Sequence, residues 1–261
     1  FLFLPITMRI VEYRIPMPMT MDEYRRGQLY AVAKASNQET EGDSGVEVLV
    51  NEPYEKGEYT GQYTKKIYHL GSKIPGWLAA IAPASALKLF EESWNGFPHI
   101  KTDLQSPFMG ARFTYTVETL HFDNDKGEQE NVHNLDKKQL KIREVKHIDI
   151  VDPVPDGADT STFHSEVTER GPLRRGWQDE VKPMMCCYKL VTVNFKYFGL
   201  QTKVESALID YQDGLFARFH QQLFCWIDEW YNLSMEELRE YENKLAEETL
   251  SKLEKEEEET K

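Results

Sequence analysis

The stretch KLVTVNFKYFGLQ, residues 189–201, alternates like a β-strand and then ends in two adjacent aromatic side chains. Tyr197 and Phe198 stand next to each other, directly before Gly199. Neighbouring residues on a strand point to opposite faces, so both aromatics are buried only if both faces of the strand are covered. The other interpretation is that the strand has already ended and the pair stands on a loop.

The composition is that of a globular protein, with 40% hydrophobic and 29% charged residues among 261. The net charge of -13 disfavours nucleic acid as a partner, because phosphates would be repelled. It also gives no broad attraction to anionic membranes. Any contact with a membrane is therefore expected to be apolar and local.

The cysteines and apolar segments favour a cytoplasmic protein. The three cysteines are Cys186, Cys187 and Cys225; the count is odd and two are adjacent, which favours a reducing compartment over a disulfide framework. The opening FLFLPIT lacks a basic region and a cleavage site, so it is a poor signal peptide. No run reaches the roughly 18 apolar residues of a membrane-spanning helix.

Local patterns predict an α+β fold. Capping boxes at Thr20–Glu23 and Ser234–Glu237 predict the starts of two helices, and residues 204–233 carry a wide apolar stripe at helical spacing. Residues 46–54 and 62–70 alternate and predict a hairpin. Further predictions are short helices with an exposed apolar turn over 73–96, strands near 99–105, 111–122 and 143–151, and irregular chain over 152–185. One antiparallel sheet with helices packed on it accounts for this order.

Motifs for covalent chemistry are lacking. The sequence has no P-loop, G-x-G-x-x-G, G-x-S-x-G or H-E-x-x-H motif. Ser85 and Lys88 fit S-x-x-K, but so short a pattern occurs by chance. The histidines are scattered, and His220 is expected on a helix surface or in the core. We therefore predict no catalytic residue, metal site or cofactor, and no enzyme activity.

Polar residues within the predicted strands allow two interpretations. Thr64 and Lys66 share one face of their strand, and Thr102, Thr119 and Lys189 lie on three others. From the pattern alone a solvated sheet face is favoured about two to one. The alternative is a set of donors that converge inside a closed cavity. A lysine with several hydroxyl groups suits an anionic phosphate joined to a polyol.

Long blocks of the chain resemble the phosphatidylinositol transfer protein family, in its single-domain class. The blocks are DEYRRGQLYAVAKAS, GVEVLVNEPYEKGEYTGQYTKKIYHLGSKIP, GEQENVHNL, RGPL, YKLVTVNFKYFGLQTKVE and FHQQLFCWIDEWYNLSMEELR, in this order. The resemblance runs from about Met8 to about residue 250. It predicts one lipid-transfer domain over 8–250, with residues 1–7 as an N-terminal extension and 251–261 as an acidic tail.

The resemblance implies a START-like fold, in which a concave antiparallel sheet and long helices enclose one phospholipid. It implies that the protein extracts phosphatidylinositol or phosphatidylcholine from one membrane and exchanges it at another. Such a carrier would be a cytoplasmic monomer that visits membrane surfaces transiently. Two rival functions stay open: a lipase in the same cavity, and a sensor that presents phosphatidylinositol to inositol-lipid kinases without bulk transfer.

The resemblance also assigns binding residues. Those expected at the inositol headgroup are Thr64, Lys66, Glu91, Asn95 and Glu242. Those expected on the phosphate side are Gln28, Thr102, Thr119 and Lys189. These positions include the inward donors suspected above, so the convergent interpretation becomes the favoured one.

Three positions depart from the family pattern. The family carries two adjacent tryptophans on a membrane-docking loop, where this sequence has Tyr197 and Phe198. Phe inserts well and Tyr prefers the interface, so we expect docking to persist. Ile100 replaces a reactive cysteine, which predicts insensitivity to alkylation there. Ser165 stands at a regulatory serine, but HSEVTER lacks the preceding lysine.

Overall fold

The computed structural model describes residues 8–40, 45–56, 59–70, 74, 76–80 and 82–259. An eight-stranded sheet dominates the fold, in the order β2-β3-β4-β5-β6-β8-β1-β7. The strands are β1 (Arg9–Met17), β2 (Gly45–Lys56), β3 (Tyr59–His69), β4 (Lys88–Gly96), β5 (His99–Gln105), β6 (Phe113–Asp123), β7 (Arg143–His147) and β8 (Met185–Phe195). All neighbouring strands are antiparallel except β1 and β7, which are parallel.

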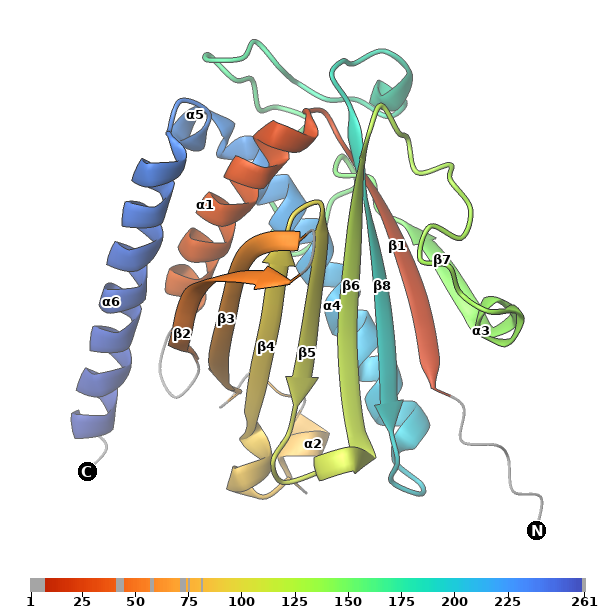
Figure 1. Ribbon diagram of the computed structural model, residues 1–261, viewed down its shortest axis with the longest axis vertical. Helices are drawn as coiled ribbons and strands as arrows, with labels where there is room; N and C mark the ends of the chain where they lie inside the picture. Colours follow the sequence, from red (N-terminus) through yellow and green to blue (C-terminus); the bar gives the residue numbers. More distant parts are fainter. Residues whose placement is uncertain are drawn as a thin grey trace.

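Three long helices accompany the sheet. The helices and 3-10 turns are α1 (Met21–Glu39), α2 (Gly76–Ala79), η2 (Ala84–Leu87), η3 (Gly110–Arg112), α3 (Lys137–Ile142), η4 (Trp177–Asp179), α4 (Gln201–Cys225), α5 (Ile227–Trp230) and α6 (Met235–Glu259). Figure 1 shows the sheet curving across one side of α1 and α4, with α6 beside α1. We call the face of the sheet that α4 covers the inner face. The architecture is α+β, and it agrees with a START-like fold.

Both predicted capping boxes are present. The Thr20 hydroxyl accepts a hydrogen bond from the Glu23 amide at 3.2 Å, and the Glu23 carboxylate accepts one from the Thr20 amide at 2.7 Å. Ser234 and Glu237 exchange the same pair of bonds at the start of α6. Each box satisfies amides that a helix leaves unpaired at its N-terminus. The predicted hairpin is also confirmed, as β2 and β3.

The main core lies between the inner face and α4. It includes Tyr13 and Val191 from the sheet and Ile209, Phe216 and Phe224 from α4. The Tyr13 hydroxyl donates to Asp213 on α4 at 2.6 Å, which ties the helix to β1. The long α4 therefore fixes the position of the central strands, which carry part of the candidate site.

A glycine lets α1 approach the end of α5. A Cβ atom at Gly27 would lie 2.8 Å from the Trp230 ring, which is closer than real contacts allow. Trp230 is fully buried, and its indole N–H donates to the Leu223 carbonyl at 3.0 Å. Close packing of helices commonly requires a residue without a side chain at such a point.

Three expectations for secondary structure were wrong. Residues 88–96 form β4 rather than helix, because their backbone pairs with β3 and β5 on both sides. The strand predicted over 143–151 ends at His147, and the predicted helix over 204–233 breaks at Trp226. β1 and α3 were not predicted. No helix in the described part of the chain is long and apolar enough to cross a membrane.

Candidate functional site

The predicted site residues on the sheet share its inner face. Directly opposite residues in neighbouring strands point the same way. Asn95 on β4 is opposite Ile100 on β5. Thr119 on β6 is opposite both Ile100 and Lys189 of β8. A row of four side chains thus crosses four strands. Ile100 is its one apolar member, between Asn95 and Thr119.

A second row begins two residues away on the same face. Thr64 on β3 is opposite Ser93, and Ser93 is opposite Thr102 on β5. The Ser93 and Thr102 hydroxyls are 2.9 Å apart and hydrogen-bonded. Ser93 was not among the predicted residues, although its alternation with Glu91 and Asn95 places it on their face.

Lys66 and Glu91 form a pair at the next position. The Lys66 ammonium lies 3.8 Å from a Glu91 carboxylate oxygen, and both side chains are largely buried. The Tyr68 hydroxyl donates to the other Glu91 oxygen at 2.9 Å. The pair presents donors and acceptors side by side, which is what a polyol requires.

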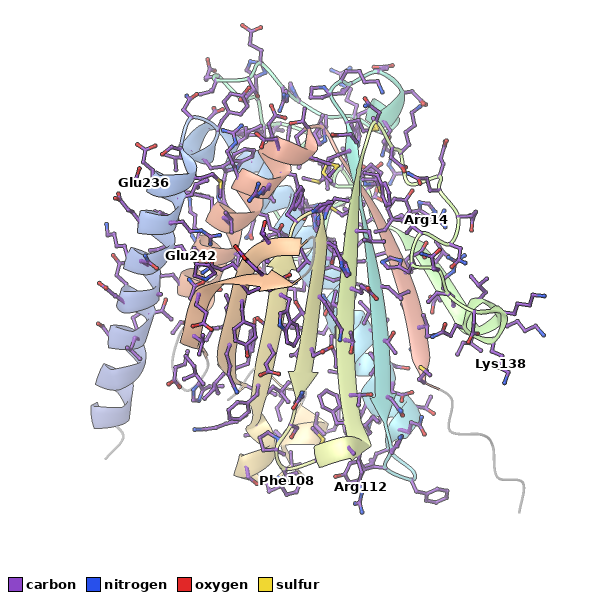
Figure 2. All side chains as sticks on the ribbon, in the orientation of Figure 1. Arg14, Phe108, Arg112, Lys138, Glu236 and Glu242 are labelled. Atoms are coloured by element: carbon purple, nitrogen blue, oxygen red, sulfur yellow. The ribbon has the colours of Figure 1, made fainter. Side chains whose placement is uncertain are left out.

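Glu242 of α6 faces the same region of β3. A cavity of about 40 Å³ lies between α6, α1 and the first hairpin. Thr64, Lys66 and Glu242 line it together with Asn51. Figure 2 shows Glu242 on the side of α6 that faces β2. Arg239 donates to its carboxylate at 2.6 Å. Residues far apart in sequence therefore meet at one small cavity, where their polar groups stand in an otherwise largely apolar wall.

Lys189 is a buried cation. Its side chain is 7% exposed, and its ammonium lies 5.2 Å from the centre of the Phe216 ring. Within the described residues no ion pair joins Lys189 to a carboxylate. Burial lowers the pKa of Lys189, since a charge is poorly solvated there. A buried ammonium of this kind suits an anionic ligand.

Two histidines near Lys189 were not predicted as part of the site. His121 follows Thr119 by two residues and shares its face; its Nδ1 donates to the Pro98 carbonyl at 2.7 Å. His121 Nε2 is buried without a hydrogen-bond partner in the described structure. Burial, reinforced by Lys189, lowers the pKa of His121 and of His220 to about 3. Both rings are therefore neutral, and neither adds a positive charge beside Lys189.

His220 was expected on a helix surface or in the core, and it is in the core. It is fully buried, and its Nδ1 donates to the Phe216 carbonyl at 2.7 Å. The Tyr24 hydroxyl, 3.1 Å away, donates to its Nε2. The hydrogen bonds on both ring nitrogens hold the neutral ring in one orientation.

Gln28 is the phosphate-side residue that the structure ties least to the others. It is half-buried on α1, the helix that also carries the buried Tyr24. Among the described residues no hydrogen bond joins Gln28 to Thr119 or Lys189. The seven sheet residues share a face and Glu242 lines a cavity with Thr64 and Lys66, whereas the place of Gln28 beside them stays a prediction.

Comparisons with known proteins identify the family of this chain. The family model described as phosphatidylinositol transfer protein matches residues 8–247. The chain is 50% identical over 259 residues to phosphatidylinositol transfer protein 1 of Dictyostelium discoideum, covering 96% of this chain and 98% of that protein. It is 45% identical over 251 residues to the human phosphatidylinositol transfer protein beta isoform, covering 92% of each. The chain belongs to the phosphatidylinositol transfer protein family.

In this family member, the aromatic pair Tyr197 and Phe198 stands on the loop after β8. β8 ends at Phe195, and Phe198 is completely exposed, with a relative exposure of 107%. Tyr197 is half-buried: its ring packs 4.9 Å from that of Phe195, and Arg112 lies over it at 5.5 Å. Only one of the two aromatics is therefore free to leave the protein surface without loss of packing.

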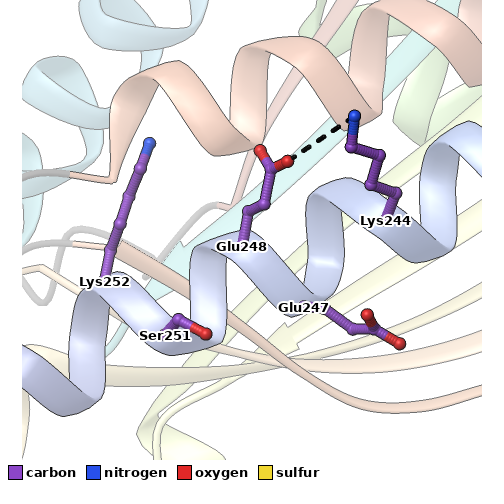
Figure 3. Close-up of a pocket in the computed structure, with 5 residues that line it drawn as sticks. All are labelled: Lys244, Glu247, Glu248, Ser251 and Lys252. Carbon is purple, nitrogen blue, oxygen red and sulfur yellow. Dashed lines mark ion pairs between the residues drawn. The ribbon is translucent and has the colours of Figure 1, made fainter.

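A larger, open depression lies along α6, away from the polar rows. Figure 3 shows its five lining residues, which all come from this one helix: Lys244, Glu247, Glu248, Ser251 and Lys252. Lys244 pairs with Glu248 at 3.9 Å, and Lys252 donates to the Asn37 carbonyl at 3.0 Å. All of its lining side chains are polar or charged, so the depression does not suit the acyl chains of a lipid.

In the part of the chain that the structure describes, no three His, Cys, Asp or Glu side chains are arranged to hold a metal ion.

Proposed function

We propose that this chain is a phospholipid transfer protein, which extracts phosphatidylinositol from one membrane, shields it and exchanges it at another. The observation that carries the proposal is the meeting of Thr64, Lys66 and Glu242 at one cavity, on the face that also bears Lys189. The names of its relatives give the lipid class. We extend the proposal to phosphatidylcholine, because a phosphate site serves both lipids.

The inositol ring is bound by Thr64, Lys66, Glu91, Asn95 and Glu242. An enclosed hydroxyl group without a partner costs about 1–3 kcal/mol, so the ring requires many donors and acceptors. Lys66 and Glu91 supply both kinds within 3.8 Å of each other. Choline has no hydroxyl groups, and these residues therefore distinguish the two headgroups without any change at the acyl chains.

The phosphate is bound on the other side of the same face by Gln28, Thr102, Thr119 and Lys189. The unpaired, buried Lys189 supports this assignment, because a phosphate would supply the charge that its surroundings lack. Neutral His121 beside it adds no second positive charge, so Lys189 is the cation that would meet the phosphate.

The acyl chains have to stay enclosed during transport. A diacyl lipid has roughly 30 methylenes, and their exposure to water would cost on the order of 25 kcal/mol. We propose that the segment around Trp77 and Leu78 opens against the bilayer, and that α6 forms the opposite side of the opening. Lys203 of α4 lies over the Trp77 ring at 4.0 Å, a contact that opening would break.

The remaining parts of the proposal follow from the same function. The carrier is one domain over residues 8–250, works as a cytoplasmic monomer that visits membranes transiently, and carries out no covalent chemistry. It supplies inositol-lipid kinases through transfer. A lipase would release fatty acid from a loaded lipid, so a hydrolysis assay separates that rival from a carrier.

Native mass spectrometry of the purified protein tests the proposal. We expect one phosphatidylinositol or phosphatidylcholine molecule on each chain, and Lys66→Ala should shift the mixture toward phosphatidylcholine. Wild-type protein that carries no phospholipid, and takes none up from vesicles, would contradict the proposal.

A further inference from the structure

Among the segments of this acidic chain that contain basic residues and no acidic ones, three belong together in the fold. They are residues 76–88, 106–112 and 196–203. Their basic residues are Lys88, Arg112, Lys196 and Lys203. In a chain with a net charge of -13, such a local excess of positive charge needs an explanation.

The three segments lie at one end of the molecule. The Lys196 amide donates to the Arg112 carbonyl at 2.8 Å, which joins the second segment to the third. The contact between Lys203 and Trp77 joins the third to the first. Figure 1 shows α2, the chain before β6 and the turn between β8 and α4 at the same end. We call this surface the basic end.

Two aromatic rings project from the basic end. Phe198 is completely exposed, and Phe108, on a different loop, is 51% exposed. Figure 2 shows Phe108 and Arg112 together at this end of the molecule. Large apolar side chains exposed at the same end of a molecule indicate a surface that meets a partner.

No ion pair in the described structure neutralises the positive charge of the basic end. All four basic residues are exposed, and within the described residues none forms an ion pair. The nearest acidic residue along α4, Glu205, is 3% exposed. Its carboxylate accepts hydrogen bonds from the Phe195 amide and the Gln201 side chain. A partner of negative charge is therefore the complement of this surface.

We propose that the basic end docks on an anionic bilayer, with Phe108 and Phe198 inserted and the four basic residues held at the lipid headgroups. The proposal rests on the proposed transfer function, because a carrier has to meet a bilayer. It adds a second insertion residue and a requirement for anionic lipid. It also directs α2, with Trp77 and Leu78, at the membrane.

The net charge does not prevent this attraction. At physiological ionic strength, charges more than about 8 Å away are largely screened, so the basic end acts through its own residues. A basic residue near an anionic membrane strengthens binding by about fivefold. Aromatic rings beside basic residues suit the boundary between headgroups and acyl chains.

Sedimentation with vesicles tests the electrostatic part. Wild-type protein should bind vesicles of phosphatidylcholine and phosphatidylserine, in a three-to-one ratio, more tightly than phosphatidylcholine alone, and salt should remove the difference. The triple change Arg112→Gln, Lys196→Gln and Lys203→Gln should weaken binding to the anionic vesicles by tenfold or more, as expected for three residues. Thermal melting checks that the fold is kept.

Helix α3 supplies the matched control. Lys137, Lys138 and Lys141 are all exposed there, and their change to Gln removes the same three charges elsewhere on the molecule. This control should bind as wild type does. Equal losses in the two triple variants would mean that net charge alone matters, and would overturn the proposal.

Phe108→Ala tests the insertion, with Ile142→Ala as control, since Ile142 is 43% exposed on α3. Phe108→Ala should weaken binding to both kinds of vesicle several-fold, and Ile142→Ala should not. The inference would be overturned if Phe108→Ala bound vesicles as wild type does. It would also be overturned if phosphatidylserine did not change the binding of the wild-type protein. If wild type still transfers phosphatidylinositol in that case, the proposed function stands; no transfer at all would count against the function instead.

Discussion

Lys66 and Lys189 are both cations on the inner face, but their surroundings differ. Lys66 has the Glu91 carboxylate 3.8 Å away, whereas Lys189 has an aromatic ring at 5.2 Å and no ion pair in the described structure. Because Glu91 balances its charge, Lys66 can donate hydrogen bonds to the neutral inositol ring without a further anion. An unpaired, buried lysine is stabilised by an anion. The two lysines are therefore suited to different parts of one lipid.

This difference predicts how substitutions separate the two lipids. Lys66→Ala and Thr64→Glu should each abolish phosphatidylinositol transfer and largely spare phosphatidylcholine transfer, because these groups address the ring. Lys189→Ala should lower transfer of both lipids. Vesicle assays with each labelled lipid measure this. Equal loss of both lipids in Lys66→Ala would show that Lys66 supports the phosphate or the fold instead.

The buried histidines predict a pH dependence of stability. The pKa of His121 and of His220 falls from 6.5 to about 3 in the folded protein, so the unfolded chain binds more protons between these values. The stability they contribute is complete above pH 6.5 and is lost as the pH falls toward 3. Each histidine should lower the free energy of unfolding by about 2 kcal/mol between pH 7.5 and pH 5.

Urea denaturation at several pH values measures this effect. The double variant His121→Asn and His220→Asn keeps amide donors in place of Nδ1, and its stability should change less over this range than that of wild type. An identical pH slope in the variant and the wild type would show that other groups cause the acid sensitivity.

At the scale of elements, the sequence predicted best where one local rule decides the structure. The capping boxes at Thr20 and Ser234 fix helix starts, and alternation identified β2 and β3. β1 was missed although residues 11–15 alternate between apolar and charged side chains. Both of its faces are buried, and Glu12 and Arg14 are paired on one of them. Residues 88–96 were misread because the apolar stretch before them suggested helix.

The β3–β4 pair makes a prediction of its own at Gly61. A Cβ atom there would lie 1.9 Å from the Asn95 carbonyl oxygen, so the two backbones would have to separate. Gly61→Ala should destabilise the protein by about 2 kcal/mol or more. It should also weaken phosphatidylinositol binding, since Asn95 moves. Thermal melting and lipid loading measure both effects.

Gly76→Ala is the control for this change. A Cβ atom at Gly76 meets nothing within 4 Å, and Gly76 begins the short helix α2. The change Gly76→Ala should leave the melting temperature unchanged or slightly raised. A Gly61→Ala protein as stable as the control would mean that the β3–β4 approach is not as close as described.

At the scale of the whole molecule, the site combines groups that no sequence window contains. Glu242 meets Thr64 and Lys66 only because α6 packs along α1 and reaches the first hairpin. The strand pattern singled out Thr64 and Lys66 but left a solvated sheet face as the better interpretation. The resemblance supplied Glu242 and the role of all three. The basic end was not predicted, for a related reason. The net charge is a sum over the whole chain and does not show where positive residues gather, and this surface forms only when three distant segments come together in the fold.

The aromatic pair after β8 yields a prediction for transfer as a whole. Tyr197→Ala with Phe198→Ala should slow transfer of every lipid, because docking loses apolar contact of a few kcal/mol. Stability should change by less than about 1 kcal/mol, since Phe198 is fully exposed and Tyr197 only half-buried. Vesicle binding and thermal melting should be measured on the same variant. A collapse of the melting temperature, or normal transfer, would show that the pair does not serve docking.

The most direct test of the central claim is the transfer of labelled phosphatidylinositol between two populations of vesicles by the wild-type protein. We predict that catalytic amounts accelerate the exchange well above the rate without protein, and that Lys66→Ala, folded and lipid-loaded, does not. Wild-type protein that gives only the background rate, with vesicles it demonstrably binds, would contradict the account.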